Sequence, residues 1–119
     1  MRDMVKTMKA LSDETRLRIL NLIIESECCV CEVMQALDIS QTRASRNLKV
    51  LHDAGFLKLR KDGLWSLYSL DKEGVKEYLP DLVEIVSKAL EGNEVTALHR
   101  ERLQKAERVG PSYAKQLHG

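Results

Sequence analysis

The chain has 119 residues with 19 basic and 18 acidic side chains, so its formal net charge is only +1. A chain of this length supports one modest core, and 44% hydrophobic with 31% charged residues is typical of a water-soluble domain. No apolar run approaches the roughly 20 residues of a membrane span, and the N-terminus lacks the apolar stretch of a signal peptide. We therefore expect a cytoplasmic protein without a membrane partner.

The N-terminal part of the chain predicts two helices. Apolar residues between Met4 and Leu11 recur on one side of a helix. Residues Ser12 to Glu14 are a capping and turn signal, after which a second helix runs from Thr15 to about Ser26. Because this second helix is apolar nearly all round, we expect it at the centre of the core.

A helix-turn-helix is predicted in the next segment. Apolar residues at i, i+3, i+4 and i+7 from Val30 to Leu37 mark a short helix. The turn Asp38 to Ser40 leads into a second helix, for which Ser40 is a good N-cap and Gly55 a natural stop. The apolar stripe of this second helix consists of Ala44, Leu48 and Leu51.

A β-hairpin is predicted directly after this helix. Residues Phe56 to Arg60 and Leu64 to Leu70 have the pattern of two strands, and they flank an Asp-Gly turn at Gly63. A helix-turn-helix followed by a hairpin is a winged helix-turn-helix. The predicted fold class is therefore mainly α with a β-hairpin wing, in a dimeric protein.

Positive charge is concentrated in the same region. Between Ser40 and Gly63 the charge is +4, although the whole chain carries only +1. The outer face of the second helix bears cations and small hydrogen-bonding side chains, which suit the DNA major groove and its phosphates. The DNA-contacting residues that we expect are Ser40, Gln41, Thr42, Arg43, Ser45, Arg46 and Lys49 in the helix, and Lys58, Arg60 and Lys61 in the wing.

The C-terminal part predicts further helices. Residues 71–78 have the pattern of a helix start, and apolar residues recur at helical spacing from Leu79 to Leu90. Pro80 either kinks this run or lies in the first turn of a new helix. We expect the apolar stripe to form a dimer interface with the first helix; packing on the chain's own core is the alternative. The stripe consists of Leu79, Leu82, Val83, Val86 and Leu90.

A charge-rich helix is predicted from Asn93 to Val109, with a frayed tail after Gly110. We divide the chain into a DNA-binding and dimerisation domain, residues 1–92, and a charged C-terminal helix with its tail, residues 93–119.

Three cysteines lie within four residues: Cys28, Cys29 and Cys31. In a cytosolic chain an odd, clustered set predicts free thiols rather than a disulfide. The start of the helix that follows favours thiolates through its dipole. On an ideal helix Cys29 and Cys31 are about 160° apart around the axis, so one ion can join them only if the first turn is irregular or becomes so.

Four motifs in order resemble the ArsR/SmtB family of metalloregulatory repressors. They are Lys9–Leu20, Ser40–Leu48, Leu51–Leu57 and Arg60–Tyr68, and the resemblance runs from about Val5 to Leu90. It implies a homodimeric winged-helix repressor that binds double-stranded operator DNA without ligand and releases it when a metal or metalloid binds.

Residues Glu27 to Glu32 resemble the arsenite-sensing members of that family. Cys29 and Cys31 match their Cys-Val-Cys motif, but the usual third cysteine is Met34 here. The resemblance implies As(III) or Sb(III) as the inducer, which soft thiolates favour, and no organic cofactor. Cys28 is the substitute third ligand that we favour, and a water or hydroxide is the alternative. Binding would unwind the start of the helix and shift the DNA-reading helix.

Other functions stay open. The same fold could carry a thiol redox or persulfide sensor, in which the cysteines oxidise instead of binding a metalloid. A thiol oxidoreductase or metal carrier fits the sequence less well. The cysteine spacing is not Cys-X-X-Cys, and such a protein has no use for the basic helix.

The remaining sequence offers no second site. The family's zinc-type site needs paired Asp and His ligands, and residues 75–92 contain no histidine. His52, His99 and His118 are isolated, and we expect them at the surface. The absence of a Ser/His/Asp group, of paired carboxylates and of a glycine-rich phosphate loop predicts a protein that is not an enzyme.

Overall fold

The computed structural model describes residues 1–73 and 77–109, which form six helices and three strands. The winged helix-turn-helix prediction is confirmed. The tail expected after Gly110 and the middle of the helix start expected at 71–78 lie outside the described residues. In chain order the elements are α1 (Arg2–Leu11), α2 (Glu14–Glu25), β1 (Cys28–Cys29), α3 (Val30–Leu37), α4 (Gln41–Asp53), β2 (Leu57–Asp62), β3 (Trp65–Leu70), α5 (Leu79–Ala89) and α6 (Glu94–Lys105).

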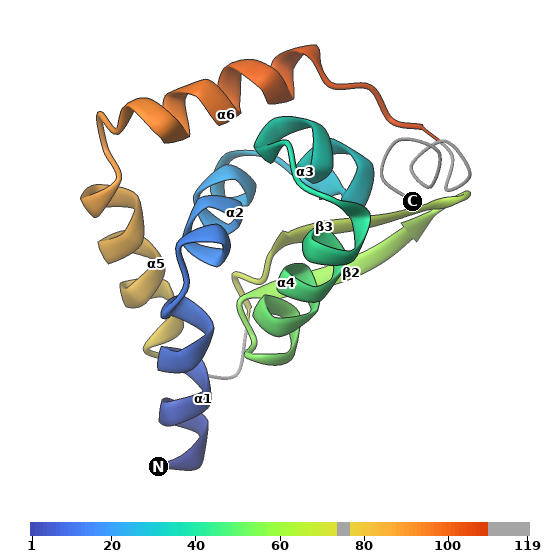
Figure 1. Cartoon of the computed structure of the whole chain (residues 1–119). Helices are drawn as coiled ribbons and strands as arrows, with labels where there is room; N and C mark the ends of the chain where they lie inside the picture. The colour runs from blue at the N-terminus through green and yellow to red at the C-terminus, as the bar shows by residue number, and fades with distance from the viewer. Residues whose placement is uncertain (74–76, 110–119) are drawn as a thin grey trace.

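Helix α2 is the centre of the core, as its all-round apolar pattern predicts. Its start is fixed by Asp13, whose carboxylate accepts a hydrogen bond from the backbone N–H of Arg16 at 3.0 Å. Residues from Ile19 to Ile23 along this helix are at most 2% exposed. The other helices surround it, with α5 on one side, α3 on the other and α6 across one end (Figure 1). None of the helices in the described ranges is both long and apolar enough to cross a bilayer.

The helix-turn-helix is formed by α3 and α4. Asp38 ends α3 in the left-handed conformation with a φ of +55°, which turns the chain sharply. The Ser40 hydroxyl then accepts a hydrogen bond from the Arg43 N–H at 3.2 Å and caps α4, as predicted. Helix α4 therefore begins at a defined residue and at a defined angle to α3.

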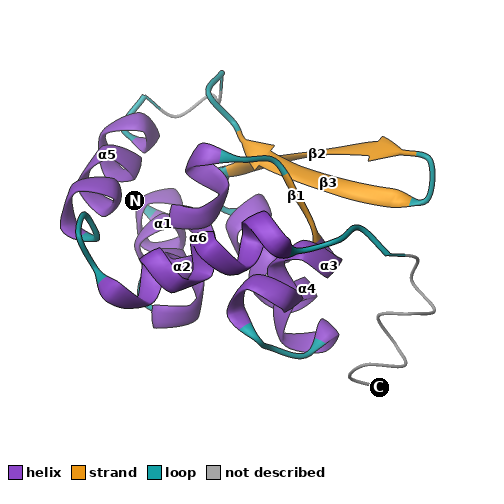
Figure 2. Cartoon of the chain, turned by 90° about the horizontal axis from the view of Figure 1, so that it is seen from above, coloured by secondary structure: helices purple, strands orange, loops and turns teal. Residues whose placement is uncertain are grey.

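The wing belongs to a three-stranded antiparallel sheet in the order β1-β3-β2. Hairpin β2–β3 extends away from the helices (Figure 2), while β1 pairs with β3 near its middle through Cys28–Tyr68 and Cys29–Leu67. No pattern in the sequence predicts β1, because a two-residue strand has no periodicity of its own. This short strand joins the cysteine segment to the wing.

The C-terminal helix is shorter than predicted. Helix α6 ends at Lys105 instead of Val109, and residues 106–109 bond to α3 and β3 instead of continuing the helix. Helix α6 itself packs on α3 and α2. Helix α5 begins with Pro80 in its first turn, where its missing N–H has no helical partner to lose.

The apolar stripe of α5 packs mainly on the chain's own core. Leu79 and Val86 are buried, and the other three stripe residues are partly buried against the same core. We expected the stripe to form a dimer interface, but the structure shows the alternative, packing on the chain's own core. The large apolar side chains that remain exposed on α1 and α5 are Met4, Val5, Met8 and Ile85, and Met1 just before α1 is exposed as well.

The turn after α4 yields a test of the fold. Gly55 has a φ of +95°, and a Cβ there would lie 3.2 Å from Leu79 Cδ1. We expect Gly55→Ala to lower the free energy of unfolding by about 2 kcal/mol, from left-handed strain and this close contact, as measured by urea denaturation. Gly92→Ala is the matched control, since its φ is +75° and nothing lies within 4 Å. Equal losses in the two variants would show that the contact with Leu79 contributes nothing.

Candidate thiol site and nucleic-acid interface

Cys29 and Cys31 are joined by a disulfide, with their Cα atoms 5.4 Å apart. The prediction of free thiols was wrong for this pair. Cys29 is not inside the helix but at its N-cap, with extended backbone (φ −83°, ψ 167°). The irregular first turn that a shared ligand requires is therefore present, and the two sulfurs converge instead of pointing apart.

Cys29 also holds the start of α3. Its sulfur accepts a hydrogen bond from the Glu32 N–H at 3.4 Å, and its own N–H donates to Glu32 Oε1 at 3.0 Å. This reciprocal pair is a capping box with a sulfur in place of the usual hydroxyl. Any change at the Cys29 sulfur therefore acts directly on the first turn of α3.

The disulfide lies in a small apolar cluster separate from the main core. Cys29 and Cys31 are 2% and 6% exposed, and they pack with Leu67 of β3 and with Trp65 and Val109. A cavity of about 170 Å³ opens beside them, lined also by Gln41 at the start of α4. Sequence reasoning missed these neighbours, because the contact between Val109 and the cysteines joins residues far apart in the chain.

Cys28 lies apart from this pair. Its side chain is fully buried in the main core, and its Sγ donates to the Ser26 carbonyl at 3.3 Å. Burial, reinforced by the Glu32 carboxylate, raises the pKa of the Cys28 thiol to about 12. Successive residues of a strand point to opposite faces, which explains the separation from Cys29. The structure therefore does not bring the three cysteines into one site.

No other side chain completes a metal site in the described ranges. Met34, which replaces the family's usual third cysteine, is buried in the main core. Across residues 1–73 and 77–109 no three His, Cys, Asp or Glu side chains form a group that could hold a metal ion.

The expectation that His99 lies at the surface was wrong. It is 5% exposed on α6, and its Nδ1 is 3.0 Å from the Ala36 carbonyl at the end of α3. Burial lowers the pKa of its imidazole. A lone histidine in a charged helix gives no sequence signal that it packs against a neighbouring helix.

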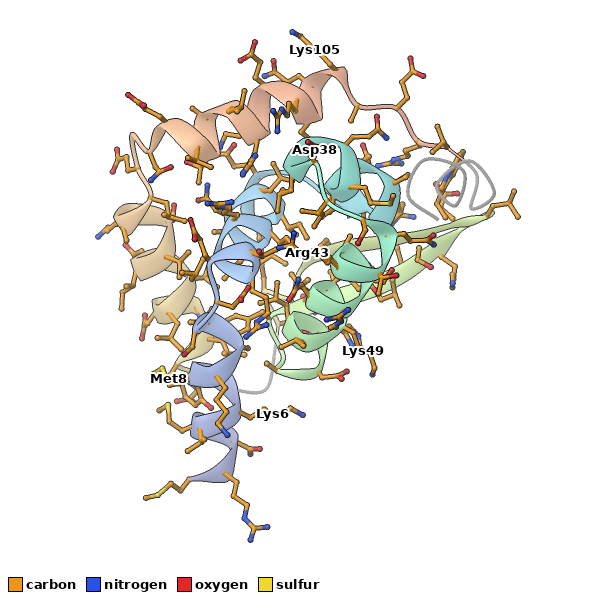
Figure 3. All side chains as sticks on the ribbon, viewed as in Figure 1. Lys6, Met8, Asp38, Arg43, Lys49 and Lys105 are labelled. Carbon is orange, nitrogen blue, oxygen red and sulfur yellow. A yellow bond between two sulfur atoms is a disulfide. The ribbon has the colours of Figure 1, made fainter. Side chains whose placement is uncertain are left out.

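Helix α4 presents the outer face that its pattern predicts. Ala44, Leu48 and Leu51 are fully buried, whereas Thr42, Arg46 and Lys49 are exposed. Figure 3 shows Lys49 projecting outward from this helix, whereas Arg43 lies on the side of α2. Lys49 forms an ion pair with Asp53 at 3.0 Å, and Arg43 donates to the Thr15 hydroxyl at 3.2 Å. The remaining expected contacts, Ser40, Gln41 and Ser45, are half-buried along the same helix.

The cations of the wing are exposed, but two of them have partners. Arg60 forms a bidentate ion pair with Glu27 at 2.9 and 2.7 Å, and these hydrogen bonds lower the pKa of the Glu27 carboxyl. Lys61 donates to the Ser66 hydroxyl at 2.6 Å. Because Glu27 directly precedes the cysteine segment, the Arg60 pair is a second connection between that segment and the wing.

Arg16 positions α4, although sequence reasoning did not single it out. Its guanidinium donates to the carbonyls of Ala10 and Lys9 at 2.7 and 3.0 Å, and to Asn47 Oδ1 at 3.2 Å. Asn47 in turn donates to the Arg43 carbonyl at 2.9 Å. One side chain of α2 thus connects the end of α1 to the middle of α4.

Comparison with known proteins agrees with this architecture. Residues 13–64 match the family described as bacterial regulatory protein, arsR family. Over 82 residues the chain is 40% identical to the arsenic resistance transcriptional regulator ArsR2 of Pseudomonas putida, a match that covers 68% of this chain and 70% of that protein. The chain belongs to the ArsR family. The resemblance found in its sequence is therefore confirmed, and this family consists of regulatory proteins rather than enzymes.

This ArsR-family chain is also similar to a second curated regulator and to a solved DNA-binding domain. It is 43% identical over 76 residues to the cadmium resistance transcriptional regulatory protein CadC homolog of Staphylococcus aureus; the match covers 63% of each chain, less than two thirds of that relative. Its fold superposes on a homodimeric winged helix-turn-helix DNA-binding domain from Mycobacterium bovis with a TM-score of 0.64 and 26% identity. That match covers 78% of this chain and 82% of that one.

The burial of Cys28 yields a test by alkylation. With a pKa of about 12, on the order of one thiol in ten thousand is ionised at pH 8. In the oxidised protein, where Cys29 and Cys31 are paired, we expect iodoacetamide to leave Cys28 unmodified for hours, as read by mass spectrometry. The same reagent in guanidinium should modify it within minutes. Rapid alkylation of the folded chain would show that Cys28 is accessible and is not a core residue.

Proposed function

We propose that this chain is a DNA-binding transcriptional repressor that releases its operator when As(III), or a similar thiophilic metalloid or metal ion, binds Cys29 and Cys31. One observation carries the proposal. The sulfur pair lies where α3, the wing strand β3 and the start of α4 meet. A ligand at these sulfurs acts on every element that a winged helix-turn-helix uses to contact DNA.

The donor set suits a soft ion with two protein ligands. A cellular thiol first reduces the Cys29–Cys31 disulfide and is itself oxidised to a disulfide. Arsenous acid then forms two As–S bonds, and each thiol proton leaves with a hydroxyl group as water. The third position keeps a hydroxide, because Cys28 lies in the main core and holds its proton. Similarity to arsenic and cadmium resistance regulators supports a thiophilic ligand.

Release from DNA follows from the capping role of Cys29. In the capping box the sulfur accepts the Glu32 N–H and so holds the first turn of α3. An As–S bond draws on the same sulfur lone pairs, and an arsenic atom between the two sulfurs holds them farther apart than the disulfide does. The first turn of α3 then shifts, and α4 shifts with it because the two helices pack together. The pairing of Cys29 with Leu67 transmits the same displacement to the wing.

The DNA-binding face consists of the exposed side of α4 and the wing. We place Gln41, Thr42 and Ser45 nearest the bases, with Ser40, Arg43, Arg46 and Lys49 beside them. Lys58, Arg60 and Lys61 of the wing bind phosphate. This assignment is supported by the exposure of the α4 cations opposite a fully buried stripe and by the similarity to the DNA-binding domain from Mycobacterium bovis.

A homodimer suits the apolar residues that stay exposed on α1. Figure 3 shows Met8 and Lys6 on opposite sides of this helix, with Met8 on the side of α5. We place the dimer interface on the apolar side, with Met4, Val5 and Met8 of α1 and Ile85 of α5. The homodimeric state of the domain from Mycobacterium bovis supports this arrangement.

The disulfide itself favours a second function, a thiol redox sensor. The oxidised pair is already formed at the junction of α3 and β3, so reduction would change the same capping sulfur without any metalloid. Arsenite and peroxide, added separately to reduced protein bound to DNA, distinguish the two functions. Release of the protein from DNA by arsenite in the absence of peroxide supports the metalloid sensor. Release from DNA by peroxide alone supports the redox sensor.

The DNA face is tested by Arg46→Ala. Loss of one phosphate contact should weaken binding several-fold and reduce the slope of log affinity against log salt by about 0.9. The measurement is fluorescence anisotropy on a duplex selected from a random library, at several salt concentrations. Lys88→Ala is the control, since Lys88 is an exposed cation on α5, outside the proposed face. An unchanged affinity and salt slope for Arg46→Ala would show that this face does not contact DNA.

The sensor is tested by single serine variants at all three cysteines. Cys29→Ser and Cys31→Ser should bind the duplex normally but stay bound at an arsenite concentration that fully releases the wild type, because one As–S bond is lost. Cys28→Ser is the matched control and should release at nearly the wild-type concentration. Normal release by a Cys29→Ser, Cys31→Ser double variant would move the ligand site elsewhere. A tenfold rise in the arsenite needed by Cys28→Ser would bring that thiol into the site.

A further inference from the structure

The four residues after α6, Ala106 to Val109, form a strap that lies over the thiol site. The chain leaves the helical conformation at Ala106, where φ is −70° and ψ is 148°. It then runs from the end of α6 toward hairpin β2–β3 (Figure 1), so that the C-terminal side of the chain meets the cysteine segment.

Three sets of hydrogen bonds hold the strap. Gln35 of α3 binds the backbone of Glu107 twice, donating from Nε2 to the carbonyl at 2.6 Å and accepting the N–H at Oε1 at 3.0 Å. The Arg108 guanidinium donates to Glu32 Oε1 at 3.0 Å. The Trp65 indole N–H donates to the Val109 carbonyl at 3.0 Å. The strap is therefore fastened to α3 at one end and to β3 at the other.

Each of these anchors is close to the sulfurs. Glu32 Oε1, which accepts from Arg108, is the same atom that accepts the N–H of Cys29 in the capping box. Gln35 also donates to the Cys31 carbonyl at 3.0 Å. Val109 packs in the cluster of the two cysteines and lines the cavity beside them. The low exposure of both sulfurs thus depends partly on a segment that the proposed DNA-binding fold does not require.

We propose that the strap is the outer wall of the sensor and selects ligands by size. The inference rests on the proposed role of Cys29 and Cys31 as ligands. The cavity of about 170 Å³ beside the sulfurs, which Val109 of the strap lines, admits a small, uncharged molecule such as arsenous acid. A bulky thiol reagent or thiol conjugate reaches the sulfurs only when the hydrogen bonds from the strap to Gln35, Glu32 and Trp65 break. Gln35 and Arg108 are positioning residues, because Gln35 binds the strap and Arg108 ties the strap to Glu32, and neither touches the ligand.

The test compares a bulky and a small thiol reagent on reduced protein. The bulky reagent is dithionitrobenzoate, an aromatic disulfide dianion. One protein thiol displaces thionitrobenzoate and forms a mixed disulfide; the second thiol then displaces the other half and restores the Cys29–Cys31 disulfide. The small reagent is iodoacetamide, which alkylates a thiol and releases iodide. Both rates are followed at one pH in the full-length chain, by absorbance and by mass spectrometry.

We expect the Gln35→Ala, Arg108→Ala double variant to react with dithionitrobenzoate at least tenfold faster than the wild type, because three hydrogen bonds that hold the strap are gone. Its rate with iodoacetamide should change less than threefold. Lys105→Ala is the matched control, since Lys105 points outward at the end of α6 (Figure 3) and forms an ion pair with Glu101 of the same helix. This control should keep both wild-type rates.

Cys28 reports on unfolding within the same experiment. A folded variant with a loosened strap releases two thionitrobenzoates per chain in the fast phase, whereas an unfolded one releases a third from Cys28. Fast release of two supports the strap as a size filter. A wild-type rate in the double variant, or an equal acceleration for both reagents, would overturn it. None of these rates depends on arsenite or DNA, so a failure of the sensor proposal remains distinguishable.

Discussion

The hydrogen-bonded pair of Cys29 and Glu32 is the contact on which the rest of this arrangement depends. The sulfur accepts the N–H of Glu32 in the first turn of α3, and the Glu32 carboxylate accepts the N–H of Cys29. The same two residues meet the wing strand through Leu67 and the strap through Arg108. A cap made by sulfur differs from one made by a hydroxyl, because sulfur is a weak acceptor and a good nucleophile. The site that starts the helix is therefore also the site at which a thiophilic ligand or an oxidant can act.

Local sequence signals predict much of the fold. Ser40 and Gly55 bound α4 because a hydroxyl cap and a left-handed glycine act within one helical turn of their own positions. The stripe of Ala44, Leu48 and Leu51 predicts which side of α4 is buried, and hence which cations remain outside. The Asp-Gly turn likewise predicts the hairpin. The family resemblance of four ordered motifs added the regulatory role, which periodicity alone does not contain.

The parts that the sequence did not predict are all contacts between distant segments. The two residues of β1 are a strand only because β3 lies beside them, and this pairing turns Cys28 and Cys29 to opposite faces. Helical geometry applied to Cys29 gave the wrong direction for its sulfur, since the residue precedes the helix. The burial of His99 and the end of α6 at Lys105 follow from docking on α3, which no pattern within residues 93–109 encodes. The dimer stripe assigned to α5 similarly finds its partners in the chain's own core.

In the proposed sensor two cysteine sulfurs, and not three, hold the ligand. X-ray absorption at the arsenic edge measures this directly on the reduced full-length protein, loaded with one equivalent of arsenite and freed of added thiols. We expect two sulfurs and one oxygen around arsenic, because Cys28 stays in the main core with its proton. Three sulfurs would contradict it, since the strand at Cys28 and Cys29 would then have to turn over when the ligand binds.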